Sequence, residues 1–138
     1  MKCFTGLFSH PSRIALLILI VLALIYLVML WNTNSIFYYT KSVFLGEVPY
    51  EEIENSLLSI YDDAYTRKGV EKVDLEIHRV FVIHDFFDGY MWISYDYIGY
   101  DENDKMIFLS TQEYPFLAKW TIHRENGEWV IVDIDEHP

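Results

Sequence analysis

The side chains best suited to acid–base or metal chemistry are histidines and aspartates in the C-terminal half of the chain. They are His78, His84, His123, Asp85 and Asp88. No HxH, HxxxH or CxxC spacing is present to place two metal ligands side by side. His84 and Asp85 are neighbours, and neighbouring residues of a strand point to opposite faces. We therefore expect turn and surface roles for these side chains, and neither a metal nor another cofactor.

A further possible acid–base group is Asp96, which lies between Tyr95 and Tyr97. A carboxylate base beside a tyrosine donor in a concave sheet would suit acid–base catalysis. The alternative is an aspartate on the solvent face of a strand, and Asp133, expected opposite Trp120, has the same interpretation. The sequence has no nucleophile motif, phosphate loop or nucleotide fingerprint. We favour the surface interpretation and expect no enzymatic activity.

Aromatic side chains suggest a different function, the recognition of a protein. The chain has 4 Trp, 11 Tyr and 9 Phe, more than a disordered tail would carry. Tyrosine and tryptophan dominate the energetic centres of protein interfaces. The candidate protein-binding face consists of Tyr90, Trp92, Tyr95, Tyr97, Trp120 and Trp129. The alternative is that these residues only pack the core of a sheet, where aromatic residues are common.

These candidates follow a long apolar segment, residues 14–31, which contains no charged side chain. As a helix it would span roughly 27 Å, close to the thickness of the hydrocarbon core of a bilayer. The membrane-anchor residues include Ile14, Leu16, Ile20, Leu24, Leu27 and Trp31. A cleaved signal peptide would have a shorter apolar region and a small-residue cleavage site, and a lipoprotein would need a cysteine after it. We therefore predict an uncleaved transmembrane helix in a lipid bilayer.

Basic residues beside the apolar segment predict its orientation. Lys2 and Arg13 precede it, and Lys41 alone follows closely. Positive charge is retained in the cytoplasm, so we expect residues 1–13 inside the cell and the C-terminal domain outside the cell membrane. Cys3 is a candidate for acylation, and an unmodified thiol is the alternative.

The region after the anchor is strongly acidic. All 21 acidic residues lie from Glu47 onward, together with only seven of the ten basic residues, so this region has a formal charge of −14. Such a surface repels nucleic acid, which we exclude as a partner. It favours a basic protein or cations, or it serves solubility alone.

Residues 32–46 are expected to form a juxtamembrane linker ahead of one α+β domain, residues 47–138. The linker would place aromatic residues among lipid headgroups, continue the anchor helix, or form a short strand. A single amphipathic helix should follow, because apolar residues recur there at helical spacing and Gly69 can end it. The apolar stripe comprises Ile53, Leu57, Ile60, Tyr61, Ala64 and Tyr65.

The rest of the domain has the alternation of antiparallel strands. The first strand begins at Val73 and changes phase near His78–Arg79, which predicts a bulge after which Val80, Val82 and Phe86 continue the inner face. Turns separate the later strands. These strands are Tyr90–Tyr100, Met106–Glu113, Phe116–Arg124 and Glu128–Asp135.

The last two strands form a hairpin around Asn126-Gly127, a strong signal for a two-residue turn. This turn fixes the register of the strands. The predicted cross-strand pairs are Glu125 with Glu128, Arg124 with Trp129, Ile122 with Ile131, and Trp120 with Asp133.

The expected fold is therefore α+β, with the transmembrane helix followed by one amphipathic helix on a curved antiparallel sheet of four to five strands. The aromatic hairpin from Trp120 through Asn126-Gly127 to Trp129 resembles those of nuclear transport factor 2-like and cystatin-like domains, over about residues 47–136. Membrane-anchored domains of this kind are common in bacteria. Because one helix is expected where nuclear transport factor 2-like domains have several, the resemblance implies the shallower cystatin-like cradle.

Three functions follow from these features. The first is a non-enzymatic, single-pass membrane protein whose acidic domain binds a protein partner or senses the cell envelope. The second is an immunity or inhibitor protein against a basic, envelope-acting toxin, because acidity speeds the capture of a cationic partner. The third is a small-ligand carrier or enzyme with a concave pocket.

Overall fold

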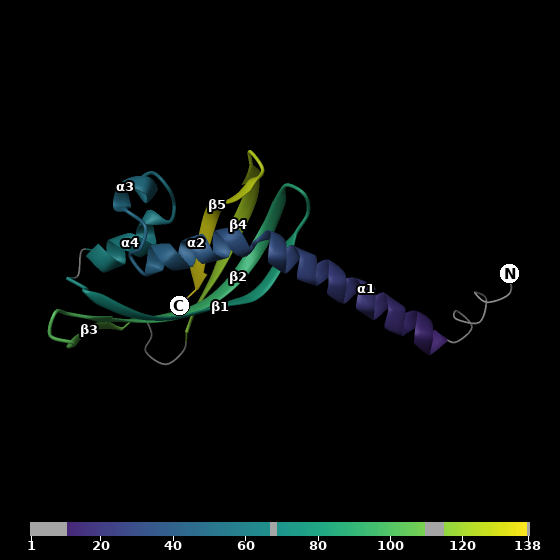
Figure 1. Cartoon of the computed structure of the whole chain (residues 1–138), viewed down its shortest axis with the longest axis horizontal. Helices are drawn as coiled ribbons and strands as arrows, with labels where there is room; N and C mark the ends of the chain where they lie inside the picture. The colour runs from purple at the N-terminus through teal and green to yellow at the C-terminus, as the bar shows by residue number, and fades with distance from the viewer. Residues whose placement is uncertain (1–10, 67–68, 110–114, 138) are drawn as a thin grey trace. The chain divides into compact units, whose positions relative to one another are not determined.

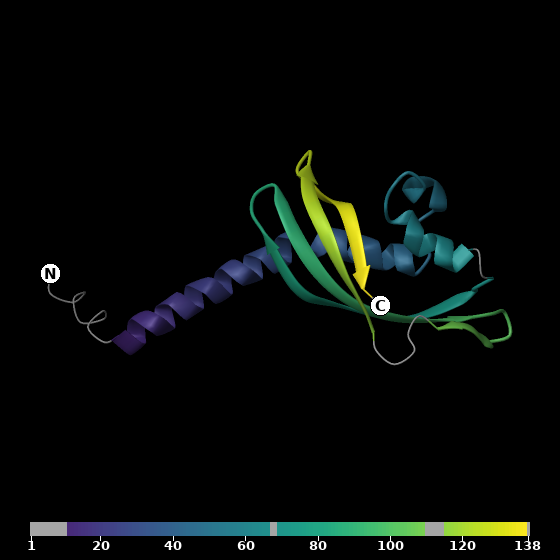
Figure 2. The same cartoon turned by 180° about the vertical axis from the view of Figure 1, so that it is seen from behind.

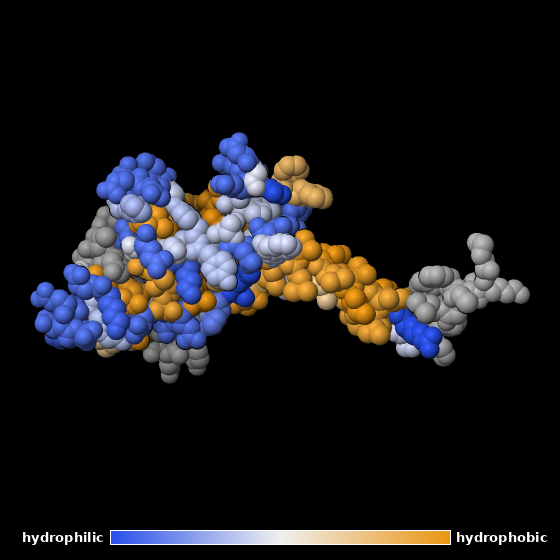
Figure 3. All heavy atoms as spheres, viewed as in Figure 1, coloured by the Kyte–Doolittle hydropathy of each residue, from blue (hydrophilic) through white to orange (hydrophobic). Residues whose placement is uncertain are grey.

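We analysed a computed structural model that describes residues 11–66, 69–109 and 115–137. By its contacts the chain divides into two compact units, Met1–Asn32 and Thr33–Pro138. In the first unit, helix α1 (Pro11–Asn32) has no buried residue and is long and apolar enough to cross a membrane. Its hydrophobic surface is continuous (Figure 3). All six anchor residues named above are exposed on it, as a lipid-facing helix requires.

The second unit contains a five-stranded antiparallel sheet that is not closed, which confirms the predicted α+β class (Figures 1 and 2). The order along the sheet is β1-β2-β4-β5, and β3 pairs with the far end of β2. Strands β1 and β5 therefore form its two edges. The strands are β1 (Lys72–His84), β2 (Asp88–Tyr100), β3 (Met106–Leu109), β4 (Phe116–Glu125) and β5 (Glu128–His137). The end of the third strand as predicted, residues 110–113, lies outside the described residues.

Three short helices accompany the sheet, and the first was not expected as part of the domain. Helix α2 (Asn34–Phe44) occupies most of the predicted linker. It lies across one face of the sheet (Figures 1 and 2), in contact with β1 and β5. Its buried residues Phe37, Val43 and Phe44 belong to the core, so by its contacts the domain begins at Thr33 rather than at residue 47. The apolar spacing of these residues explains why this segment packs on the sheet.

The prediction of a single amphipathic helix in this region is wrong. Two helices take its place, α3 (Tyr50–Ile53) and α4 (Ser59–Thr66). The interruption follows from Ser56. Its hydroxyl donates to the Ile53 carbonyl at 2.9 Å and accepts from the Leu58 amide at 3.2 Å. A serine that bonds to nearby backbone groups competes with helical hydrogen bonds.

The break also changes the apolar stripe. Ile53 and Tyr61 are buried as expected, but Leu58 is buried instead of Leu57, and Ile60 is exposed. The side chains of Ala64 and Tyr65 lie outside the described residues.

The face of the sheet beneath the helices, here called the inner face, carries the core. Met91, Ile93, Trp120 and Ile122 are completely buried there. The aromatic ring of Phe44 in α2 stacks on Tyr61 of α4, with centroids 4.1 Å apart, and lies 4.9 Å from Tyr95 of β2. The helices thus form a second layer on the inner face of the sheet, with the core between the two layers.

The predicted bulge is confirmed, because the pairing of β1 with β2 shifts between Arg79 and Phe81. The extra residue is Val80, which is exposed and not on the inner face as expected, whereas Val82 is buried. Phe86 is also exposed, since it lies beyond the strand at the tip of the β1–β2 hairpin.

The Asn126-Gly127 hairpin is confirmed in its first three pairs, from Glu125–Glu128 to Ile122–Ile131. The fourth pair is wrong: Trp120 lies opposite Ile134, and Asp133 lies opposite Thr121. A second register shift between Thr121 and Ile122 adds one residue to β5. The sequence offers no turn signal at that point.

Candidate functional site

The six aromatic residues of the candidate face do not share one face of the sheet. Tyr95, Tyr97, Trp120 and Trp129 lie on the inner face, and Tyr90 and Trp92 on the opposite, outer face. Alternation along β2 separates them, because residues 90 and 92 point away from residues 95 and 97. Each group must therefore be considered separately.

The inner group is joined by hydrogen bonds as well as by packing. The buried Trp120 Nε1 donates to the Tyr61 hydroxyl at 2.9 Å. The Tyr95 hydroxyl donates to Glu136 Oε1 at 2.7 Å. The carboxylate of Glu136, near the end of β5, therefore accepts from Tyr95, and its negative charge also acts on Tyr61. Glu136 was not predicted; only its position on an edge strand near the chain end could have suggested an accessible carboxylate.

This arrangement keeps the tyrosines protonated. Burial is the largest cause that raises the pKa of Tyr61, Tyr95 and Tyr97, and the negative charge of Glu136 raises all three further. The pKa of Tyr97 rises to about 12. Such tyrosines are stable hydrogen-bond donors and poor acids, so the network is better suited to fixing the core than to transferring protons.

Trp129 closes the inner face at the other end of the sheet. Its ring lies 4.8 Å from the His84 ring, and the Arg124 guanidinium lies 5.8 Å from its centroid. Gly89 of β2 pairs with His84, and an added Cβ there would clash with His84 Cβ. The absence of a side chain at position 89 lets the two strands approach this closely.

The outer group consists of Tyr90, which is exposed, and Trp92, which is half-buried. We define the outer aromatic patch as Phe81, Ile83, Tyr90 and Trp92. Phe81 and Trp92 have ring centroids 5.6 Å apart, and Tyr90 and Trp92 have theirs 6.0 Å apart. Phe81, Ile83 and Tyr90 are each between 44% and 47% exposed. Exposed aromatic clusters of this kind mark surfaces that other molecules cover.

Polar residues border the outer aromatic patch. The Lys119 Nζ lies 5.8 Å from the centroid of the Tyr90 ring and 3.6 Å from an Asp135 carboxylate oxygen. The His123 Nδ1 lies 2.6 Å from Asp88 Oδ1 at the same end of the sheet. An apolar centre with a charged rim is the usual composition of a protein interface.

The remaining acid–base candidates are not brought together. Asp96 is on the outer face opposite Glu76, whereas its neighbours Tyr95 and Tyr97 face inward. Asp85 Oδ1 accepts from the amides of Asp88 and Phe87, and these bonds lower the pKa of its carboxyl group. Within the described residues, no cluster of three His, Cys, Asp or Glu side chains could hold a metal ion.

Comparison of the chain with models of protein families, with curated proteins and with solved structures found no match. The resemblance to nuclear transport factor 2-like and cystatin-like domains thus remains an expectation from the sequence.

Proposed function

We propose that this chain is a non-enzymatic, single-pass membrane protein whose acidic domain binds a protein partner. One observation carries the proposal: helices fill the inner face of the sheet, and the outer face displays the outer aromatic patch. In the proposed orientation the N-terminus is cytoplasmic and the domain is extracytoplasmic. The packed inner face gives less support to a small-ligand carrier or an enzyme with a concave pocket.

The experiment is site-specific photocrosslinking of the full chain in cells that naturally contain it. A photoreactive residue replaces Trp92 in the outer aromatic patch or, as a control, Leu57, an apolar residue exposed on the helical side. The proposal expects one defined protein adduct from position 92 and none of the same mass from position 57. Equal labelling from both positions, or lipid adducts alone, would contradict it.

The partner so identified is then purified, and its affinity for the full chain is measured. Phe81→Ser with Trp92→Ser should weaken binding by about thirtyfold or more, as expected for central aromatic residues of an interface. The control variant Leu57→Ser should leave the affinity unchanged.

The formal charge of −14 after the anchor favours one special case, an immunity or inhibitor protein against a basic, envelope-acting toxin. Opposite charges accelerate association, and salt screens this effect. The test is co-expression with the secreted toxin encoded beside the gene. Rescue of growth would support this case, and the lack of such a neighbour or of rescue would exclude it.

A further inference from the structure

Strand β1 ends the sheet, and no strand in the described part of the chain pairs with its outer edge. Its partner β2 lies on one side only, since the order of the sheet begins at β1. From Val73 to Ile77 the pairing with β2 is regular, because the bulge occurs only after Arg79. An edge strand of regular geometry is a template on which another extended chain can form backbone hydrogen bonds.

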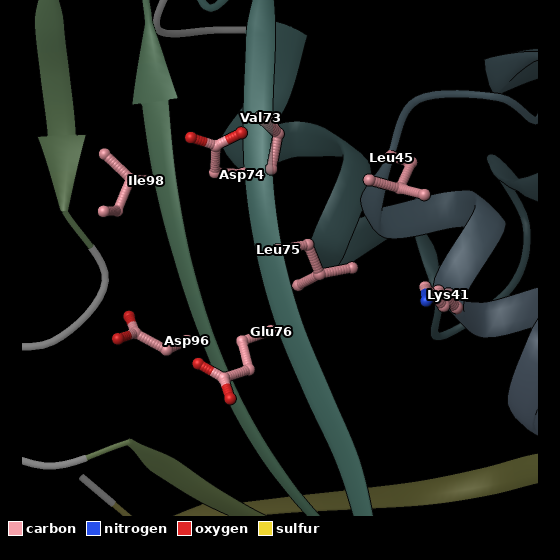
Figure 4. A pocket seen from close by; sticks show the side chains of 8 residues that line it. All are labelled: Lys41, Leu45, Val73, Asp74, Leu75, Glu76, Asp96 and Ile98. Carbon is pink, nitrogen blue, oxygen red and sulfur yellow. The ribbon is translucent and has the colours of Figure 1, made fainter.

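A groove of about 480 Å³ follows this part of the edge, and Figure 4 shows the side chains that line it. Successive residues of β1 point to opposite sides. Val73 and Leu75 point towards α2, where Leu45 completes an apolar side, and Lys41 lies beside it. Asp74 and Glu76 point the other way.

The second side of the groove is acidic. Asp96 and Ile98 of β2 complete it, and Glu76 lies directly opposite Asp96 in the register of the sheet. Asp74 and Glu76 are both exposed. Three carboxylates therefore line the outer side of the groove, and Glu76 Oε1 there also lies 3.0 Å from His78 Nε2. Among the described residues that line the groove, Lys41 is the one lysine or arginine, and it is on the inner side.

We propose that the edge of β1 binds an extended basic segment of the protein partner, which adds to the sheet as a further strand. The alternation of β1 specifies the occupant. Its inward side chains are apolar and contact Val73, Leu75 and Leu45, and its outward side chains are Lys or Arg and face the carboxylates. This inference rests on the proposed function and gives the partner its chemistry.

A second copy of this chain is a poor occupant of the same edge. Pairing of β1 with β1 would place Asp74 and Glu76 of one copy beside the same residues of the other. Like charges opposite one another destabilise a strand pair. The high negative charge after the anchor adds further repulsion between copies.

The probe is a fluorescent, end-blocked nine-residue peptide in which Lys and Val alternate, and the protein is the full chain in uncharged detergent micelles. Anisotropy gives its affinity beside that of a Glu–Val peptide of equal length. We expect the Lys–Val peptide to bind at least about tenfold more tightly. Equal affinities would overturn the proposal.

Charge alone would also attract a cationic peptide, so a second probe removes the hydrogen bonds. In this Lys–Val peptide, alternate backbone amides are N-methylated along one edge, which leaves every charge in place. Loss of binding, together with slower hydrogen exchange of β1 amides when the first peptide is bound, supports strand addition. Undiminished binding of the N-methylated peptide would overturn it.

Charge reversal at the groove tests its location. Asp74→Lys with Glu76→Lys should reverse the preference, so that the Glu–Val peptide binds more tightly. The matched control is Glu125→Lys with Glu128→Lys, an exposed cross-strand pair at the β4–β5 turn that changes the net charge equally. If the control reverses the preference as well, the edge is not the binding site.

The two proposals fail in different ways. If a partner crosslinks at Trp92 but the Lys–Val peptides ignore the β1 edge, the proposed function stands and this inference is wrong. If photocrosslinking finds no partner, the proposed function fails. Binding of the Lys–Val peptide at the β1 edge would then still support strand addition there, and lack of binding would overturn it.

Discussion

At the scale of single residues, the bond from Trp120 to Tyr61 joins the helices to the sheet. Both side chains are buried, and the donor and acceptor are 2.9 Å apart. A buried N–H that loses its acceptor costs about 1–3 kcal/mol. This bond therefore lends itself to a double-mutant cycle.

Tyr61→Phe should lower the free energy of unfolding by about 1–3 kcal/mol, because it leaves the indole N–H of Trp120 unpaired. Trp120→Phe should cost more, since it also removes buried volume. The double variant should cost less than the sum of the two by about 0.5–3 kcal/mol, as measured by denaturant unfolding followed by near-UV circular dichroism. Tyr50→Phe, at a partly exposed tyrosine, is the control, and strict additivity would contradict the coupling.

At Gly89 a substitution would add atoms where the structure has no space for them. Gly89→Ala should destabilise the domain by about 1–3 kcal/mol, because the new Cβ would clash with His84 Cβ and lie 2.7 Å from the Ile83 carbonyl oxygen. Ser94→Ala, elsewhere on the same strand, should change the stability by less than about 0.5 kcal/mol. Thermal unfolding of both variants in the same detergent compares them. Equal melting temperatures of the Gly89→Ala and Ser94→Ala variants would show that β1 and β2 can move apart at this point without loss of stability.

At the scale of elements, Arg79 holds the start of α2 against β1. Its guanidinium donates to Thr33 Oγ1 at 3.0 Å and to Asn34 Oδ1 at 2.7 Å. It also lies 5.2 Å from the centroid of the Phe37 ring. Because β1 changes phase just after this residue, Arg79 remains on the inner face.

Arg79→Ala should lower the free energy of unfolding by about 1–3 kcal/mol, since hydrogen bonds to a partly buried charged group are lost. Hydrogen exchange should accelerate first at the amides of α2 and much less where β2 pairs with β4. Arg79→Lys should recover part of the loss. His78→Ala, at the exposed neighbouring position, is the control; uniform acceleration over the whole domain would argue against a local role.

The strands could be predicted from the sequence because alternation and turn residues act locally. The bulge after Arg79 and the first pairs of the Asn126-Gly127 hairpin were predictable for this reason. The two-part helix could not be predicted, because it depends on backbone bonds made by Ser56. The packing of α2 on the sheet could not be predicted either, since its apolar residues suit a membrane surface as well as a sheet.

The candidate site was predicted only in part. Tyr90 is exposed and Trp92 is half-buried on the outer face, but periodicity alone could not decide which face of β2 the helices would cover. The partnership of Tyr95 with Glu136 joins residues 41 positions apart. Such a contact depends on the register of the sheet, which the second bulge shifts by one residue.

At the scale of the whole molecule, the buried tyrosines predict sensitivity to alkali. Their pKa values are raised above the ordinary value of 10, that of Tyr97 to about 12. Above about pH 10 the unfolded chain loses these protons more readily than the folded chain, so stability falls as the pH rises. Below pH 10 the buried tyrosines are protonated in both the folded and the unfolded chain, so the stability of the fold is not lowered by their ionisation.

Denaturant midpoints between pH 8 and pH 12 should therefore decrease above about pH 10, and phenolate absorbance should show tyrosines that ionise only on unfolding. Tyr97→Phe should reduce this decrease, whereas Tyr50→Phe at an exposed position should not. A midpoint that stays constant up to pH 12 would contradict the role of burial.

Orientation is a separate prediction for the whole chain. A phosphatase that is active only outside the cytoplasm, fused after Pro138, should be active in cells, because more positive charge precedes α1 than follows it closely. A fluorescent protein that matures only in the cytoplasm is the reciprocal reporter. Fluorescence with no phosphatase activity would overturn both the extracytoplasmic location and the toxin alternative.

The connection between α1 and α2 is a single residue, Thr33, whose side chain is fully buried. Where α1 spans a bilayer, the domain is carried in the plane of that membrane by the same chain. A partner embedded in the same bilayer would meet it by lateral diffusion, and the frequency of encounter would follow the number of copies per area of membrane.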